Sequence, residues 1–152
     1  MLSGPIILDG VSVSSSVGYE IRTSCRGDIA IGNIIFNGAG PGAPHLGTDW
    51  PNAVLRSHGP LIVAGDAAHF LDIDAGWAYI LHDVIFTGNR SFGCTIRARN
   101  GSYAVLDGTW TVNGSVTAIK ACVYENSMVS RQNVTVPGSG VETLTGGIFN
   151  PP

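Results

Sequence analysis

The chain has 152 residues, of which 44% are hydrophobic and only 12% are charged, and it includes 21 glycines. This length is typical of a single domain, and the composition favours a sheet-rich protein with many turns over a helical one. The net charge of −3 provides no basic surface for phosphate groups, which argues against nucleic-acid binding.

The first ten residues, MLSGPIILDG, lack the basic start and long apolar middle of a signal peptide, and no apolar stretch reaches membrane length. We therefore expect a protein that is made in the cytoplasm without a signal peptide and does not insert into a membrane. The three cysteines, Cys25, Cys94 and Cys122, match no zinc-binding spacing. We expect them to be buried as small apolar side chains.

One motif recurs from the first expected strand onward: apolar, any residue, apolar, any residue, glycine. Its six copies read IILDG, IIFNG, LIVAG, VIFTG, WTVNG and VTVPG, and they end at positions 10, 38, 65, 88, 114 and 138. Two further strand-like runs follow the later copies at shared offsets. They read HFLDI, CTIRA and AIKACV from residues 69, 94 and 118, and WAYIL, YAVL and SMVS from residues 77, 103 and 127. The pattern predicts three short strands in each period of about 25 residues.

Strands that recur at this period predict a coil in which each strand lies beside its copy one turn later. The motif and its spacing resemble the right-handed parallel β-helix proteins, among them pectate-lyase-like enzymes and the tailspikes and tail fibres of bacteriophages. The resemblance implies an all-β fold, a short single-stranded right-handed parallel β-helix of about five rungs with three strands per rung. Residues 1–152 would form a single domain with a long loop insertion at about 39–52. A β-sandwich or jelly roll is the alternative architecture.

Alternate residues of a strand point to opposite sides of its sheet, so the two apolar positions of the motif are predicted to face inward. In particular, we expect one continuous interior column made of Phe36, Val63, Phe86 and Val112. The residue between the two apolar positions should face outward, where an apolar side chain needs a cover. We expect the residues at this position to form an oligomer interface, with residues 39–60 of the same chain as the alternative cover. They are Ile7, Ile35, Ile62, Ile85, Thr111 and Thr135.

The low charge and the apolar outward positions are typical of a rigid part that interlocks with its neighbours. Together with the β-helix resemblance, they predict a non-enzymatic structural protein of the virion of a bacteriophage or phage-like particle. It would be a component of a tail fibre or spike, or a decoration protein of the head. The expected assembly is a homotrimer that contacts other virion proteins and cell-surface polysaccharide. We expect no cofactor and no metal, because the sequence contains no phosphate-binding loop, catalytic triad or metal-ligand spacing.

The longest irregular stretch, residues 37–52, contains His45, Asp49 and Trp50. These side chains could stack on a sugar ring and hydrogen-bond its hydroxyl groups, so we expect them to bind glycan. Asp72 and Asp74 point to the same side of one strand and complete the predicted glycan-binding set.

The alternative function is a carbohydrate-active β-helix, either a polysaccharide-binding module or a depolymerase. Enzymes of that kind use paired carboxylates or a carboxylate cluster that holds calcium. The sequence around His58, SHGP, departs from their Gly-His-Gly motif, and no pair of aspartates follows it. This departure argues against catalysis.

Overall fold

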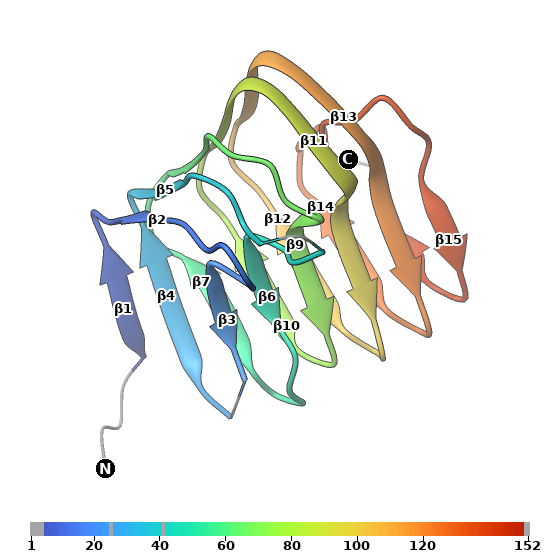
Figure 1. The fold of residues 1–152 in the computed structure, drawn as a ribbon. Helices are drawn as coiled ribbons and strands as arrows, with labels where there is room; N and C mark the ends of the chain where they lie inside the picture. Colours follow the sequence, from blue (N-terminus) through green and yellow to red (C-terminus); the bar gives the residue numbers. More distant parts are fainter. Residues whose placement is uncertain (1–4, 25, 41, 151–152) are drawn as a thin grey trace.

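The computed structural model describes residues 5–24, 26–40 and 42–150, and every regular element in these ranges is a β-strand. The strands pair in parallel with their sheet neighbours and stack into a β-solenoid of about six turns. The N-terminal strands lie at one end of the stack and the C-terminal strands at the other (Figure 1). The prediction of an all-β parallel coil is confirmed, and the antiparallel sandwich is excluded.

The first sheet contains seven strands, and the chain returns to it after about one period each time. In spatial order they are β1 (Ile6–Asp9), β4 (Asp28–Gly32), β7 (Val54–Ser57), β10 (Trp77–Ile80), β12 (Tyr103–Leu106), β14 (Met128–Arg131) and β16 (Ile148–Phe149). This order follows the chain, so each of the five inner strands is hydrogen-bonded to the strand one turn before it and the strand one turn after it.

The second sheet is bent, because its longest strand takes part in it twice. In spatial order its strands are β2 (Ser12–Val13), β5 (Ile34–Phe36), β8 (Leu61–Val63), β11 (Val84–Arg99), β9 (His69–Asp74), β6 (Leu46–Thr48) and β3 (Ile21–Thr23). β11 pairs with β8 through residues 84–86 and with β9 through residues 94–99. β13 (Trp110–Tyr124) pairs alongside β11 and is followed by β15 (Thr143–Thr145).

The predicted interior column exists, with all four residues in register. Phe36 pairs with Val63, Val63 with Phe86, and Phe86 with Val112. The first three side chains are fully buried, and the ring of Phe70 packs edge-on against Phe86 at a centroid distance of 5.4 Å. Val112 stays 37% exposed because no described strand pairs with it on its far side.

Two details of the sequence prediction are wrong. The first motif, IILDG, forms β1 of the first sheet, where Ile6 pairs with Ile29, and not the strand that precedes β5. It fits the motif because strands on either sheet alternate apolar and polar residues in the same way. The solenoid also has about six turns rather than five, since β15 and β16 follow the last motif copy.

Four corners that follow strands of the second sheet share one backbone conformation. The residue directly after β9, β11, β13 and β15 has a positive φ in every case: 55° at Ala75, 58° at Asn100, 54° at Glu125 and 69° at Gly146. Glycine and asparagine adopt this left-handed conformation readily, whereas a side chain such as alanine does so at a cost. Ala75 is therefore a strained position.

We expect Ala75→Asn to raise the free energy of unfolding by about 1 kcal/mol, because asparagine relieves the left-handed strain. Urea unfolding of the variant and the parent measures the change. The reverse exchange at the equivalent corner, Asn100→Ala, should lower the free energy of unfolding by at least as much. Equal stability of Ala75→Asn and the parent would contradict the assignment of strain to this corner.

Candidate functional site

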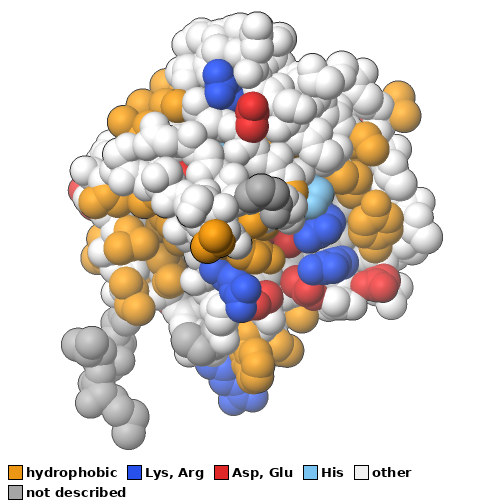
Figure 2. All heavy atoms as spheres, viewed as in Figure 1, with side chains coloured by type: hydrophobic (Ala, Val, Ile, Leu, Met, Phe, Trp, Pro, Cys, Tyr) orange, Lys and Arg blue, Asp and Glu red, His pale blue; other side chains and the backbone are white. Residues whose placement is uncertain are grey.

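Charged side chains gather on the outer side of β6, β9 and the second half of β11 (Figure 2). We call this surface the polar face. Its ion pairs are Arg22–Asp49 at 2.7 Å, Arg97–Asp72 at 2.7 Å and Arg99–Asp74 at 2.9 Å. The parallel register of β9 and β11 places Arg97 opposite Asp72 and Arg99 opposite Asp74. The opposite charges on β9 and β11 therefore neutralise each other between neighbouring turns.

Tyr19 lies across the polar face over β6. A Cβ atom added at Gly47 would lie 2.3 Å from Cε1 of Tyr19, so the ring fills the space that a side chain at this position would need. The Tyr19 hydroxyl donates a hydrogen bond to Oδ2 of Asp72 at 3.2 Å. Burial and then the negative charge of Asp72 raise the pKa of Tyr19 to about 12. Tyr19 is therefore a neutral hydrogen-bond donor at physiological pH.

Asp72 is fully buried beneath these partners. Nε and Nη2 of Arg97 donate to its two carboxylate oxygens, each at 2.7 Å. The hydrogen bond to Asp72 is also the main cause that raises the pKa of Arg97. The carboxylate is thus bound by Arg97 and Tyr19 and has no exposed surface on which a ligand could meet it.

A disulfide lies beside the polar face, between β11 and β13. Cys94 and Cys122 are bonded, with a Cα–Cα distance of 6.1 Å, and both are buried. The predicted burial is confirmed for these two residues, but the expectation of simple apolar side chains is wrong, because successive turns bring them together. Cys25 lies outside the described residues.

His69 pairs with Cys94 in the register of β9 and β11. Burial, followed by the charge of Arg97, lowers the pKa of His69, so its ring is neutral at pH 7.

Three of the five predicted glycan-binding residues meet on the polar face. Asp49, Asp72 and Asp74 each belong to one of its ion pairs. Trp50 follows Asp49 and is 51% exposed. His45 instead lies inside the solenoid with no exposed surface, so a ligand cannot reach it. The stretch predicted as a loop also contains β6, and its residues 43–48 are buried.

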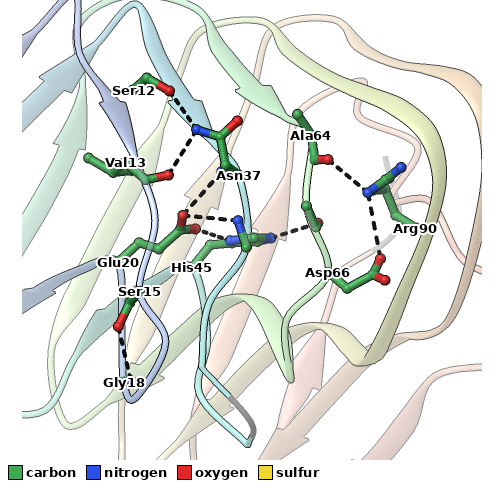
Figure 3. A network of polar contacts seen from close by, with 12 residues as sticks. Ser12, Val13, Ser15, Gly18, Glu20, Asn37, His45, Ala64, Asp66 and Arg90 are labelled. Atoms are coloured by element: carbon green, nitrogen blue, oxygen red, sulfur yellow. Dashed lines mark hydrogen bonds and ion pairs between the residues drawn. The ribbon is translucent and has the colours of Figure 1, made fainter.

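His45 forms a buried pair with Glu20 near the N-terminal end (Figure 3). Both side chains have no exposed surface, and Nδ1 of His45 contacts Oε2 of Glu20. The other carboxylate oxygen, Oε1, accepts hydrogen bonds from the backbone N–H groups of Asn37 and Gly38, each at 3.1 Å. Nε2 of His45 lies 3.1 Å from the carbonyl oxygen of Gly65. These contacts fasten the corner before β3 to the two following turns.

Both partners of His45 are acceptors. Nε2 faces the carbonyl oxygen of Gly65, which only accepts, so Nε2 donates to it. Nδ1 faces Oε2 of Glu20 inside the same buried pair. Removing either Glu20 or His45 would leave the other unsatisfied in the interior.

Four of the six predicted interface residues form one outward row. Ile35, Ile62, Ile85 and Thr111 are paired in register on β5, β8, β11 and β13, and we call them the isoleucine ladder. Ile35 and Thr111 are exposed, and the two central isoleucines are half-buried. The other two lie elsewhere, because Ile7 pairs with Ala30 in the first sheet and Thr135 belongs to no strand.

The outer side of the first sheet carries an aromatic surface that the sequence prediction did not include. Trp77 pairs with Tyr103 and Tyr79 with Val105 in the register of β10 and β12. The guanidinium of Arg56 lies over the Tyr79 ring, 4.9 Å from its centroid. Val54 and Met128 flank these residues, and we call the six apolar side chains the aromatic face. WAYIL and YAVL contain the corresponding pattern, since their alanines face inward and alternate with outward Trp, Tyr and Val.

No protein-family model, curated protein or solved structure matches the chain. The described residues contain no group of three or more His, Cys, Asp and Glu side chains placed to hold a metal ion. Within the same ranges there is no helix that could cross a membrane. The fold and the three outer surfaces are therefore the basis for a functional proposal.

Proposed function

We propose that the chain is a non-enzymatic structural protein of a bacteriophage or phage-like particle, a rigid column that associates side by side with its own copies as a trimer. It would serve in a tail fibre or spike or as a decoration of the head. The support comes from the solenoid fold, which resembles that of phage fibres and spikes, and from the chemistry of its outer surfaces.

For the fine structure of the column, we propose a right-handed coil with three strand segments in each complete rung. The two separate pairings of β11, with β8 and with β9, support two segments per turn in addition to the strand of the first sheet. The handedness follows from the rule that connections between parallel strands of one sheet are almost always right-handed.

The observation that carries the proposal is the isoleucine ladder. Ile35, Ile62 and Ile85 lie directly above one another on the outer side of a parallel sheet, whose faces are ordinarily both covered. Residues 39–60, the alternative cover, are used for β6 and β7 in the stack. A neighbouring copy would remove these side chains from water, and the favourable free energy is about 25 cal/mol for each Å² of apolar surface buried.

The polar face supports a structural function over a catalytic one. Asp72 and Asp74 are the carboxylates that a glycosidase would use, and each is paired with an arginine. General acid–base chemistry needs a carboxyl group whose proton can reach the substrate. Asp72 has no such access, so its contribution is to hold adjacent turns together.

Light scattering on the purified chain tests the proposal. We expect a particle of three chains of 15.8 kDa each, and we expect Ile62→Lys to dissociate it, because the lysine charge would be buried at the centre of the contact. Val17→Lys is the matched control, since Val17 is 91% exposed and lies outside the ladder. A monomeric parent, or an Ile62→Lys variant that remains trimeric, would contradict the assembly.

A further inference from the structure

We propose that the aromatic face is a second contact surface, through which two copies of this chain pack face to face about a two-fold axis near β10. It extends the proposed assembly but depends on a different sheet and on different residues from the isoleucine ladder. The two proposals can therefore fail independently.

The aromatic face is continuous along the first sheet. One row of outward side chains runs through Asp28, Val54, Trp77, Tyr103, Met128 and Ile148 in strand register. The adjacent row runs through Ala30, Arg56, Tyr79, Val105 and Ser130. At the centre, Trp77 is 44% exposed. Ile148 is 55% exposed, and the other apolar side chains, from Val54 to Met128, are half-buried. Part of this apolar surface is therefore in contact with water.

The composition of this surface is that of a protein–protein contact. Interface cores are enriched in aromatic residues, Met and Arg and depleted in Lys, Glu and Asp. The two rows contain Trp, two Tyr, Met and a single Arg, they contain no Lys or Glu, and their one Asp, Asp28, is paired with Arg56. The Tyr79 and Tyr103 rings are inclined by 73° to each other, so they do not form the coplanar platform on which a sugar ring would stack.

The charges on the face favour a second copy of the same chain in two-fold arrangement. Nε of Arg56 donates to both carboxylate oxygens of Asp28, at 3.1 and 2.9 Å, so the cation and the anion lie together on β4 and β7. β12 and β14, on the other side of β10, present uncharged side chains outward. A two-fold axis that runs parallel to β10 and is centred on it places the ion pair of one copy opposite the uncharged half of the other, so like charges do not meet.

The size of the face predicts a reversible contact. The two rows span six strands, β4 to β16, so strands about 4.8 Å apart and four residues wide give a surface about 24 Å long and about 13 Å across. That footprint is smaller than the roughly 800 Å² per partner of a standard interface. We therefore expect a dimer that forms and dissociates with concentration rather than a permanent one.

Sedimentation equilibrium over a range of concentrations tests the contact, with Ile62→Lys as the starting protein so that the ladder does not contribute. We expect this protein to show a concentration-dependent monomer–dimer equilibrium. Adding Trp77→Lys should weaken dimerisation by about 100-fold, because it places two like charges at the two-fold axis. Adding Val17→Lys, which introduces the same charge outside the face, should leave the dissociation constant unchanged.

We expect Trp77→Lys to fold normally, because Trp77 points outward and is about half exposed. A circular dichroism spectrum and a thermal midpoint that match those of the starting protein would verify this. Monomer at every concentration before the Trp77 substitution would overturn the inference. Equal dimerisation with and without Trp77→Lys would also overturn it. Neither result would affect the trimer proposal, which depends on the response of the parent chain to Ile62→Lys alone.

Discussion

Replacement of Glu20 by alanine is expected to lower the free energy of unfolding by about 3–5 kcal/mol, which is the cost of leaving one partner of a buried ion pair alone. In this variant the backbone N–H of Gly38 and Nδ1 of His45 lose the acceptor that Glu20 provides, whereas the N–H of Asn37 keeps its hydrogen bond to the carbonyl oxygen of Val13. Urea unfolding followed by tryptophan fluorescence measures the loss.

Glu20→Gln is the matched control for this variant. Its amide oxygen can accept the same two backbone hydrogen bonds, and its amide nitrogen can donate to Nδ1 of a neutral His45. We expect a loss of only about 1 kcal/mol, because every buried group keeps a partner. An alanine variant as stable as the parent would show that the pair does not fasten the corner before β3. Equal losses in both variants would assign the effect to the carboxylate charge.

Removal of the disulfide is expected to lower the free energy of unfolding by about 3–4 kcal/mol. The bond closes a loop with a sequence separation of 28 residues, and in the chain-entropy account the stabilisation grows with the length of that loop. Cys94 and Cys122 lie on strands that are already hydrogen-bonded to each other, so the bond acts mainly by restricting the unfolded chain. Unfolding of the Cys94→Ala/Cys122→Ala variant in urea gives the value.

Reduction of the parent provides an independent measurement of the same quantity. A thiol reductant should destabilise the parent by a similar amount and should leave the double-alanine variant unchanged. If the reduced and oxidised parent unfold at the same urea concentration, the disulfide does not contribute to stability. Alanine is chosen because a serine hydroxyl would be unsatisfied at these buried positions.

The strands could be predicted from the sequence because the physical pattern is local. Residues 69–73, 94–98 and 118–123 are strands in the structure, as are 77–80, 103–106 and 128–130. Alternation of apolar and polar residues identified their inward sides. The motif glycine did not mark every strand end, because β11 and β13 continue through Gly88 and Gly114. The interior column through Phe36, Val63 and Phe86 follows from the same alternation once the strands are stacked in parallel.

Much of the candidate site could also have been predicted from the repeat period of about 25 residues, although the sequence prediction did not use the period for this purpose. Residues one turn apart lie side by side, and this relation joins Glu20 with His45, Asp72 with Arg97 and Asp74 with Arg99, each pair 25 positions apart. A search for oppositely charged residues at this separation would have found all three pairs. The disulfide, with a separation of 28, would have needed a wider window.

Other features depend on where the chain turns. The two sheets carry the same alternation, so the motif at β1 was assigned to the wrong sheet and Ile7 to the wrong surface. His45 was placed on a loop because its segment is rich in Gly and Pro, yet the backbone there continues the stack and carries the ring inward. Burial of this kind is set by the neighbouring turns.

The parallel coil could be predicted from period and alternation, because short-range sterics and apolar burial convert these local properties of the chain directly into stacked strands. Which side chains meet depends on the folded solenoid: the ring of Tyr19 over Gly47, the buried contact of Glu20 with His45, and the aromatic face of the first sheet. Turn lengths vary by several residues from one turn to the next, and each added or missing residue in a corner changes which positions stack. That choice is made by packing over the whole solenoid.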